Sequence, residues 1–468
     1  MANEWANQGL DLHLDTGPGA PRGTVRARLM DALREAVGSG RLAPGTRLPS
    51  SRQLAADLGL ARNTVADAYA ELAAEGWLTA RQGSGTRVAA RTAPVPRKAS
   101  RPERAAGLPL HDLRSGSPDL TAFPRAAWLK AARQAVEQAP ASAFGWPGTG
   151  REELRTALAE YLARVRGVRA DPGRILVTAG FTEGLRQLLP RLRERGVRTV
   201  AVESYGLWVH WGILREAGMR VVVLPFDADG TVPLPPPGTH AVLLTPSHQF
   251  PTGGALLPER RAALVDWARA HDGLVLEDDY DGEFRYDRQP VGALQGLDPE
   301  RVVHLGTTSK SLATGLRLGW AVLPAALATG SLAPHAEWGG TTWGPGVVDQ
   351  LTFAAFLRSG AYDRHVRAMR LRYRRRRDAL VAAVTARAPE VGVSGIAAGL
   401  HAVLRLPPGT EPVVLRAATW ERLALTGLGQ FRHPDAGLPP EDALVVGYAT
   451  PPEHAWPSAL EALCRVLP

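Results

Sequence analysis

The chain has 468 residues, of which 45% are hydrophobic and 22% are charged, and its formal net charge at pH 7 is +9. This length predicts two or more domains, and this composition is typical of folded globular proteins. A single cysteine, Cys464, excludes an intramolecular disulfide framework. Because the N-terminus lacks the pattern of a signal peptide and no uncharged apolar run reaches bilayer length, we expect a cytoplasmic protein with no membrane partner.

The positive charge is concentrated near the N-terminus. Residues 22–104 contain 15 Lys and Arg residues against 7 Asp and Glu residues, which is a net charge of +8. Residues 1–21 carry −3, and the remaining 364 residues carry only +4. A basic segment of this kind favours a polyanion as the partner of that segment alone.

Residues 20–88 are predicted to form a winged helix-turn-helix domain. An apolar residue at every fourth position predicts an amphipathic helix over 24–38, on the face formed by Val25, Leu29, Leu33 and Val37. The stretch LPSSRQLAADLG predicts a second helix with Ser50 as its N-cap, and ARNTVADAYAELAAEG predicts a third in the recognition position. WLTARQGSGTRV has the strand, glycine turn and strand of a hairpin wing.

Side chains at the helix N-termini and in the wing are the candidates for DNA contact, because base edges and phosphates are usually met there. The residues expected to bind DNA are Ser51, Arg52, Arg62, Asn63, Thr64, Arg81, Ser84 and Thr86. The alternative is a three-helix protein-interaction module with solvated arginines, which the charge asymmetry disfavours.

The run GRLAPGTRLPSSRQLAADLGLARNTVADAYAELAAEGWLTARQGSGTRV resembles the winged helix of GntR-family transcription regulators over nearly fifty residues. Residues 89–111 follow it and are rich in Ala, Pro and Arg without apolar periodicity. This composition predicts a semi-extended, flexible linker that lets two domains move relative to one another.

Residues 112–468 are predicted to form an α/β domain with a mostly parallel sheet, its large part over about 150–330 and its small part over about 345–468. Helical patterns alternate there with short β-branched runs, namely RILVTAG, TVAVES, RVVVLPF, HAVLLTP, LVLEDDY and VVHLGTT. Ligands of such sheets bind outside the carboxyl ends of the strands.

Two of these strand ends carry candidate binding groups. Gly180 to Glu183 open a helix whose free amides suit an anion. Asp278 and Tyr280 are two residues apart and are expected on one face of their strand, where a carboxylate and a phenol could hold opposite edges of a flat heterocycle. Two other interpretations of this stretch stay open, a Mg²⁺ site formed by Glu277, Asp278 and Asp279 or a solvated acidic turn.

Lys310 follows the strand VVHLGTT. Partial burial and the nearby cation Arg317 are expected to favour the neutral amine that forms a Schiff base. The hydroxyls of Thr307 and Ser309 together with the Arg317 guanidinium can bind a phosphate. A lysine, a phosphate site, a carboxylate and a phenol together predict binding of pyridoxal 5′-phosphate (PLP), and the alternative is a surface lysine beside a loop arginine.

The runs TPSHQFPTGG, EDDYDGEFRY and TTSKSLATGLRLGW resemble the fold-type I aminotransferase domain of the MocR-type subfamily of GntR regulators. With the winged helix, this resemblance spans about residues 20–450. By matching position it implies that Lys310 is the internal-aldimine lysine, that Asp278 pairs with the pyridine nitrogen and that Tyr280 pairs with the ring oxygen. It implies that the phosphate is bound by Thr307, Ser309, Arg317, Gly180, Phe181 and Thr182. An aromatic residue usually stacks on the cofactor ring, and Tyr205 and Trp208 are the candidates.

The chain departs from the subfamily pattern at several positions. Val445 stands where an arginine commonly binds an effector carboxylate, and Arg432 and Arg405 are candidates to replace it. Thr314 stands where the subfamily has proline, and Phe250 replaces the aminotransferase asparagine, which is usual in the subfamily. The basic run 371–381 is expected to be a solvated helix face or a dimer contact. The histidines are too scattered for a metal site.

We therefore predict a homodimeric transcription regulator that binds double-stranded operator DNA and senses PLP itself, or an amine or amino-acid effector, through a PLP-bearing domain. The alternative is a working PLP-dependent aminotransferase with a fused DNA-binding domain. The absence of an arginine at position 445 disfavours that alternative, because transamination needs an anchor for the substrate carboxylate.

Overall fold

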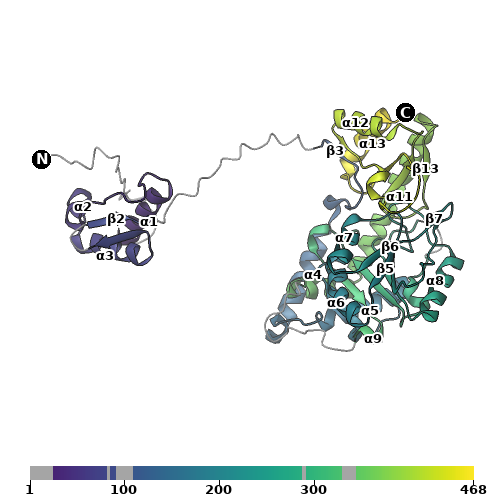
Figure 1. The fold of residues 1–468 in the computed structure, drawn as a ribbon, viewed down its shortest axis with the longest axis horizontal. Coiled ribbons are helices and arrows are strands. Elements are labelled where there is room, and N and C mark those ends of the chain that lie inside the picture. The colour runs from purple at the N-terminus through teal and green to yellow at the C-terminus, as the bar shows by residue number, and fades with distance from the viewer. Residues whose placement is uncertain (1–24, 82–84, 91–108, 287–290, 329–343) are drawn as a thin grey trace. The chain divides into compact units, whose positions relative to one another are not determined.

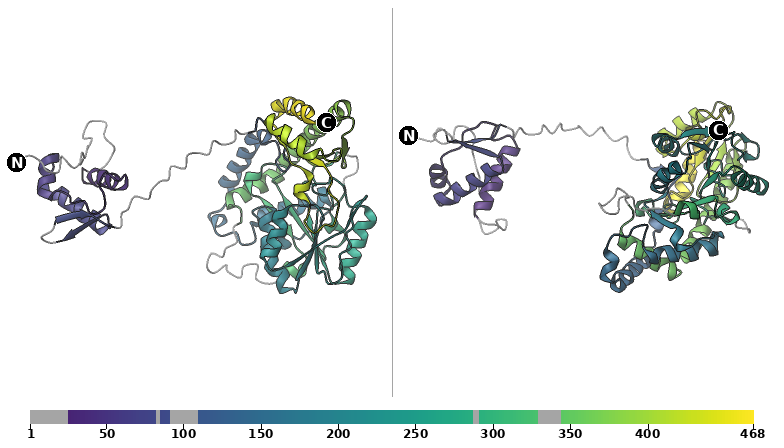
Figure 2. Two further views of the ribbon diagram at one scale, coloured as in Figure 1. Left: turned by 45° about the horizontal axis from the view of Figure 1, so that its top comes forward. Right: turned by 60° about the horizontal axis from the view of Figure 1, so that its bottom comes forward.

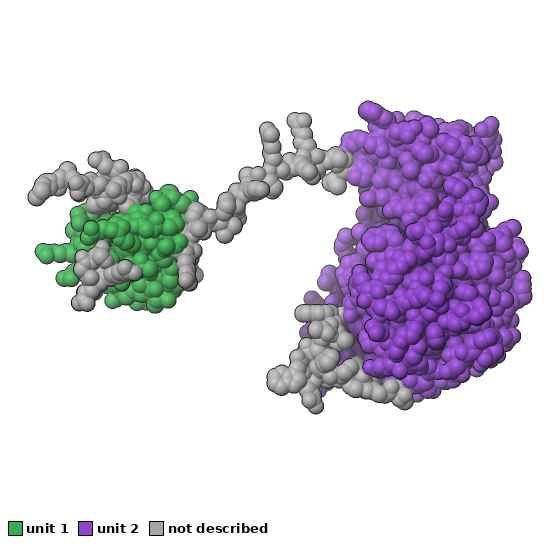
Figure 3. All heavy atoms as spheres, in the orientation of Figure 1, with its two compact units in different colours: residues 1–107 green, residues 108–468 purple. Residues whose placement is uncertain are grey.

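A computed structural model describes residues 25–81, 85–90, 109–286, 291–328 and 344–468. The chain divides into two compact units, Met1–Gly107 and Leu108–Pro468 (Figure 3). In the described ranges, no helix is long and apolar enough to cross a membrane.

The first unit is a winged helix-turn-helix, as predicted. Its elements are α1 (Val25–Gly38), α2 (Ser51–Leu58), α3 (Arg62–Ala74) and the antiparallel hairpin of β1 (Leu78–Arg81) and β2 (Gly85–Val88) (Figure 1). The hydroxyl of Ser50 accepts a hydrogen bond from the Gln53 amide at 3.2 Å, which confirms the predicted N-cap. Gly59 ends α2 in the left-handed conformation, with φ of 64°.

The core of this unit lies between the three helices and the hairpin. Leu29, Leu33 and Val37 are buried as predicted and pack with residues of α2, α3, β1 and β2. Val25 is 39% exposed, so its prediction as part of the apolar face is wrong. Val25 is the first residue of α1, and the buried face begins one turn later.

The second unit is built on a seven-stranded sheet of order β4-β12-β11-β10-β9-β5-β6. All neighbours are parallel except β12, which is antiparallel to both β4 and β11. Six strands match the six predicted runs, and β12 was not among them. The strands are β4 (Ile175–Thr178), β5 (Thr199–Val202), β6 (Arg220–Val223), β9 (Ala241–Leu244), β10 (Leu274–Asp278), β11 (Val302–Thr307) and β12 (Gly319–Val322).

Helices cover both faces of this sheet (Figure 2). One face packs against α6 (Phe181–Glu194) and α7 (Trp208–Glu216), whose leucines form one buried cluster with the strands. The other face packs against α8 (Pro258–Ala270), through Leu264, Val265 and Ala268. A further cluster joins α4 (Arg125–Gln138), α5 (Glu152–Arg166) and α10 (Val347–Arg358) to the β4 and β12 edge. Strands buried on both faces explain the nearly continuous apolar runs in the sequence.

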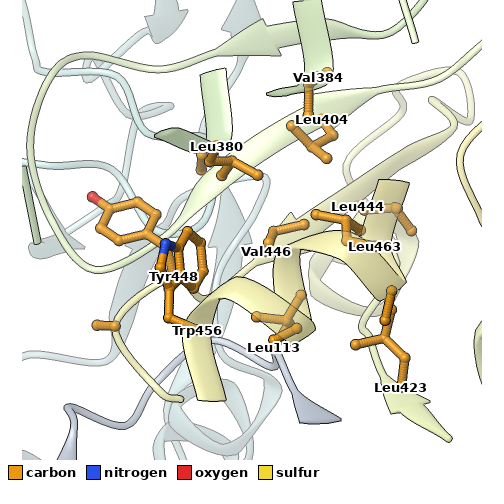
Figure 4. Close-up of a cluster of buried hydrophobic side chains, with 14 of the residues drawn as sticks. Leu113, Leu380, Val384, Leu404, Leu423, Leu444, Val446, Tyr448, Trp456 and Leu463 are labelled. Carbon is orange, nitrogen blue, oxygen red and sulfur yellow. The ribbon is translucent and has the colours of Figure 1, made fainter. Parts of the chain in front are cut away.

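The C-terminal part of this unit is a smaller layer around an antiparallel sheet of order β13-β14-β16. Its core includes Leu113, which precedes the large domain in the chain, and Leu404, Leu444 and Trp456 (Figure 4). The elements of this part are α11 (Ala361–Arg387), β13 (Gly392–Ser394), β14 (Ala402–Arg405), α12 (Glu411–Trp420), β15 (Leu423–Ala424), β16 (Ala443–Val446) and α13 (Trp456–Val466). The remaining short elements are β3 (His111–Asp112), β7 (Phe226–Asp227), β8 (Gly230–Thr231) and α9 (Ala325–Ala328).

The predicted linker, 89–111, has described residues only at its two ends. The amide of Ala89 donates to the carbonyl of Trp77 in the first unit. His111 lies in β3, which pairs in parallel with β15 of the second unit. Residues 91–108 lie outside the described residues.

The basic run 371–381 lies within α11 and is only partly a solvated face. Arg376 is 2% exposed, and its guanidinium donates to Asp119 Oδ2 at 3.1 Å and to Glu453 Oε2 at 2.7 Å. Arg372 also binds Asp119. The expectation of a solvated face is therefore wrong for Arg376, because the buried carboxylate of Asp119 and the backbone carbonyls of Tyr448 and Pro451 lie on its side of the helix.

Candidate functional site

A cavity of about 620 Å³ lies at the carboxyl ends of the parallel strands in the second unit. Its lining brings together residues from β10, from the end of β11 and the residues after it, from the start of α6, from the segment that follows β3 and from the C-terminal layer. The predicted cofactor residues that line it are Phe181, Thr182, Tyr205, Asp278, Tyr280, Thr307, Ser309, Lys310 and Arg317. Gly180 is not part of the lining, but its backbone lies against the Arg317 guanidinium.

Lys310 follows β11 and its amine faces the cavity. Burial lowers the pKa of Lys310, while the charges of Asp278 and Asp281 act in the opposite direction. The expectation that the charge of Arg317 favours the neutral amine stays a prediction. The amine donates a hydrogen bond to the carbonyl of Gly116 at 2.6 Å. A partly desolvated amine is the form from which a Schiff base can be made.

Asp278 is the last residue of β10, and its side chain reaches the cavity. Its Oδ1 atom is buried without a hydrogen-bond partner among the described residues. Burial raises the pKa of Asp278 well above its usual value, against the opposing charge of Lys310. A buried polar atom without a partner is costly, so this oxygen is suited to a donor supplied by a ligand.

The neighbouring carboxylates belong to other environments. Glu277 accepts hydrogen bonds from the amides of Leu294 and Gln295. Asp279 binds Arg166 through both carboxylate oxygens and also contacts His304. Protein groups therefore satisfy the carboxylates of both Glu277 and Asp279. The described residues contain no cluster of metal ligands, so the Mg²⁺ interpretation is wrong. The solvated acidic turn is also wrong, because all three carboxylates are buried.

Tyr280 lies just beyond the end of β10 and still lines the cavity beside Asp278. Its hydroxyl is 2.9 Å from Nδ1 of His248, and the same nitrogen is 2.8 Å from Asp281 Oδ2. Burial raises the pKa of Tyr280 well above its usual value. His248 lies in the TPSHQFPTGG stretch but was not among the predicted site residues, so its position beside Tyr280 was missed.

The predicted phosphate site has the geometry of an anion cradle. Gly180 caps α6 with φ of 88°, and a Cβ atom at this position would lie 3.3 Å from the Arg317 guanidinium. Thr307 and Ser309 bind one another through their hydroxyls at 2.9 Å. Among the described residues, the Arg317 guanidinium has no hydrogen-bond or ion-pair partner. Helix amides, hydroxyls and an unpaired guanidinium are the groups that bind phosphate.

The two candidates for the stacking aromatic are placed differently. Trp208 is 62% exposed and does not line the cavity, so its prediction is wrong. Tyr205 lines the cavity, but its ring packs edge-on against Phe226 at 5.4 Å between centroids. His210, which was missed, also lines the cavity and lies 4.5 Å from the Phe181 ring. Burial and the charge of Lys310 lower the pKa of His210 to about 4.

Neither candidate for the missing carboxylate anchor reaches the cavity. Val445 is fully buried and packs with Tyr205 and Phe431. Arg405 is exposed and pairs with Glu441 at 3.1 Å, and Arg432 is not part of the cavity lining. Both predictions are therefore wrong. The described lining contains one arginine besides Arg317, which is Arg114, and the sequence interpretation did not single it out.

Phe250 and Thr314, the two other departures, both line the cavity. The Phe250 ring packs edge-on against Tyr280, with 5.9 Å between centroids, and against His401 at 5.3 Å. Burial and the neighbouring His248 lower the pKa of His401 to about 3. This wall of the cavity is therefore made of uncharged rings.

The predicted DNA-contact residues belong to the first unit. Arg52, Arg62 and Asn63 are exposed, and Ser51, Thr64 and Thr86 are half-buried. Arg62 is the first residue of α3, the recognition helix. Arg81 ends β1, and Ser84 lies outside the described residues.

Comparison with known proteins agrees with both units. Residues 25–88 match the gntR family of bacterial regulatory proteins, and residues 110–428 match aminotransferase class I and II. The chain is 35% identical to the HTH-type pyridoxine biosynthesis transcriptional regulator PdxR of Corynebacterium glutamicum, over 94% of this chain and 95% of that protein. It is 32% identical to the probable rhizopine catabolism regulatory protein MocR of Rhizobium meliloti, over 91% of this chain and 90% of that one.

Solved structures give the same fold for the second unit. An archaeal alanine:glyoxylate aminotransferase superposes with a TM-score of 0.68 at 24% identity, covering 77% of this chain and 91% of that one. The chain therefore belongs to the MocR and PdxR type of GntR transcription regulators, in which a DNA-binding helix-turn-helix domain is fused to a domain with the aminotransferase class I and II fold.

Proposed function

We propose that this regulator holds PLP in the cavity of its second unit and that the occupant of the cavity controls DNA binding by the first unit. The observation that carries the proposal is that residues 112 and 114–117, which directly follow the linker, form part of the cavity wall. The amine of Lys310 binds this wall through the carbonyl of Gly116. A group that reacts with or displaces this amine acts on the segment that leads to the DNA-binding unit.

The residues present fit PLP at each of its polar groups. The unpartnered Oδ1 of Asp278 suits the protonated pyridine nitrogen, and the Tyr280 hydroxyl suits the ring oxygen. PLP supplies an aldehyde that condenses with a primary amine, for which Lys310 is the candidate. The remaining residues proposed to contact PLP are Gly180, Phe181, Thr182, Tyr205, Thr307, Ser309 and Arg317.

His248 and Asp281 position the phenol of Tyr280. Because His248 Nδ1 lies between the Asp281 carboxylate and the Tyr280 hydroxyl, one proton on this nitrogen can serve only one of them at a time. With that proton on the Asp281 side, the Tyr280 hydroxyl remains free to donate to the oxygen of a bound ring. His248 therefore acts through Tyr280.

The segment of the cavity wall is joined to the C-terminal layer by one backbone hydrogen bond and one hydrogen bond from a side chain. The Gly447 amide donates to the Leu113 carbonyl at 2.6 Å, and the Thr450 hydroxyl donates to the Arg114 carbonyl at 2.8 Å. If this segment can adopt two conformations, a ligand that binds one of them more tightly shifts the equilibrium toward it and so changes the conformation at the end of the linker. By linkage, DNA then shifts the affinity for the ligand by the same factor.

The first unit is proposed to bind double-stranded DNA through its recognition helix and wing. Arg62, Asn63 and Thr64 begin α3, where side chains reach base edges in the major groove. The other proposed contacts are Ser51, Arg52, Arg81, Ser84 and Thr86. A homodimer, as the aminotransferase fold implies, would present two such units to two half-sites.

The second candidate function is transamination, which the cavity favours through Lys310 and its lowered pKa. The case for transamination is weaker because Val445 is buried and leaves no guanidinium at the position where a substrate carboxylate would be anchored. We therefore propose regulation with at most weak turnover.

The test is a titration of the full-length protein with PLP, followed by visible absorbance and by binding to its own promoter DNA. We expect a yellow protein whose cofactor is trapped by borohydride and whose DNA affinity changes with PLP or with an added amine. A protein that takes up no PLP contradicts the proposal. Rapid conversion of amino acid to keto acid favours the second candidate.

A further inference from the structure

Arg114 lines the cavity, but its guanidinium is not among the groups proposed to contact PLP. Its Nε and Nη2 atoms donate to the two oxygens of Asp112, at 3.0 and 2.6 Å. No hydrogen bond joins Nη1 to another described residue, so the outer edge of the guanidinium, formed by Nη1 and Nη2, is open to a second acceptor.

The segment of Arg114 lies beside the strand that carries Val445. The backbone of Arg114 forms an isolated antiparallel bridge with Val446, so the two segments lie side by side. Arg114 therefore reaches the cavity from the segment next to the strand end that carries Val445. Arg114 lines the cavity, whereas Val445 is buried among Tyr205 and Phe431 and does not, so the cation reaches the cavity from a different segment of the chain.

The other basic side chains of the described lining are either proposed to bind PLP or uncharged. Arg317 lies against Gly180 at the phosphate site, and Lys310 is the amine that would meet the aldehyde. Burial lowers the pKa of both His210 and His401, so these rings are neutral at pH 7. Arg114 is thus the charged donor left for a second anionic group of a ligand.

The pair with Asp112 does not prevent such binding. The side chains of Arg114 and Asp112 are 57% and 35% exposed, and partly exposed ion pairs contribute little to stability. An arginine can hold one carboxylate on its Nε edge and a second on its outer edge. Hydroxyl and amide side chains that line the same cavity can hold the rest of a polar ligand, namely Ser115, Ser117, Thr426, Gln430 and Thr450.

We propose that Arg114 binds the carboxylate of an amino-acid effector and so makes the cavity selective for amino acids over amines. This inference rests on the proposed PLP-dependent regulation and names the chemical class of the ligand. Because Arg114 lies two residues from Gly116 and directly after the linker end, binding of the carboxylate acts on the same wall that Lys310 contacts.

The experiment uses the full-length protein loaded with PLP. L-Alanine, β-alanine and 5-aminopentanoate are titrated against their carboxylate-free counterparts, ethylamine and butylamine, and the change in the cofactor absorption band gives each Kd. Promoter binding is measured in parallel. In the native protein we expect at least one amino acid to bind about tenfold or more tightly than its amine, the size expected for a hydrogen bond to a charged group.

Arg114→Gln should reduce this preference to within about twofold while the protein still takes up PLP. Arg114→Lys, which keeps the charge but not the forked geometry, should retain part of the preference. The control is Arg405→Gln, which removes an exposed arginine of the same C-terminal layer that does not line the cavity, and it should leave the preference unchanged.

Two outcomes overturn the inference alone. One is a native protein that binds PLP but does not distinguish amino acids from amines, and the other is an Arg114→Gln protein that keeps the full preference. If Arg114→Gln does not fold, unchanged selectivity of Arg114→Lys overturns it. A native protein that takes up no PLP contradicts the proposed function itself.

Discussion

The amine of Lys310 and the carbonyl of Gly116 are joined by a hydrogen bond of 2.6 Å across 194 residues of sequence. Lys310 follows the central strands of the large sheet, whereas Gly116 lies just after β3, where the linker enters the second unit. The group expected to react with PLP therefore touches the part of the chain nearest to the linker.

Replacing Lys310 with alanine should remove both the amine and its bond to Gly116. We expect a protein that folds, that forms no borohydride-trapped adduct with PLP and whose promoter affinity no longer responds to PLP. Absorbance and DNA-binding titrations check this. An unchanged spectrum together with an unchanged DNA response would contradict the assignment of Lys310.

Asp278→Asn should weaken PLP binding by about tenfold to a hundredfold, because the protonated pyridine nitrogen loses a charged partner. Burial raises the pKa of Asp278, so in cofactor-free protein this group stabilises the fold less as pH rises above about 4. The amide removes that penalty, and the thermal unfolding midpoint of the cofactor-free variant at pH 8 should equal or exceed that of the native protein. A markedly lower midpoint would mean that Asp278 has a structural role.

Gly180→Ala should lower PLP affinity at least about tenfold. The residue has φ of 88°, and the added Cβ would meet the Arg317 guanidinium at 3.3 Å. The matched control is Gly212→Ala, since Gly212 lies within α7 and a Cβ there meets nothing within 4 Å. Alanine there should stabilise the helix by about 0.5–1 kcal/mol and leave PLP binding unchanged. Equal PLP affinities of the two variants would contradict the phosphate assignment.

Acidification should destabilise the cofactor-free protein through its buried imidazoles. Burial lowers the pKa of His210 to about 4 and that of His401 to about 3, below the value of about 6.5 in an unfolded chain. Between pH 6.5 and 4 the unfolded state therefore binds protons that the folded state does not, which costs about 1.4 kcal/mol per pH unit for each group.

The variant His210→Phe tests this pH effect because it removes one of the two buried imidazoles. The fall of its unfolding midpoint between pH 7.5 and 5.0 should be smaller than that of the native protein. His454→Gln, which changes an exposed histidine, should behave like the native protein. If His210→Phe shows the native pH dependence, His210 is not held neutral.

Arg62→Ala should weaken promoter binding by about 1–3 kcal/mol if Arg62 contacts a base, and should relax sequence preference at one position of each half-site. If Arg62 contacts a phosphate instead, binding should weaken on all sequences and the salt dependence should fall by about one ion. Fluorescence anisotropy at several salt concentrations separates the two cases. Loss of PLP uptake in this variant would be unexpected, because Arg62 belongs to the other unit.

Sequence patterns predicted most of the fold because those patterns are local. The capping residue Ser50, the buried positions Leu29, Leu33 and Val37, and six of the seven sheet strands follow from helical or strand periodicity. β12 was not predicted because its short run GWAV follows a loop without a strand-like alternation.

The parts of the site that were mispredicted depend on which way a side chain points once the chain has folded. Trp208 and Tyr205 are three residues apart, yet Trp208 is exposed and Tyr205 is buried, since α7 begins at Trp208. Glu277 and Asp279 were candidate Mg²⁺ ligands, but partners distant in sequence satisfy both, among them Arg166 and the Gln295 amide. His210 and Arg114 were missed because no quoted motif contains them, and His248 was missed although TPSHQFPTGG contains it, because only the fold brings it to Tyr280.

The sequence by itself determined the two-part architecture, the winged helix, the parallel sheet and the order of residues around Lys310, because each depends on neighbours within a few turns of chain. Only the tertiary structure decided that the segment at the end of the linker lines the cavity, that Val445 is buried and that Arg114 lies beside Val446. Those facts depend on contacts between residues hundreds of positions apart, which packing of the C-terminal layer creates and which local periodicity does not encode.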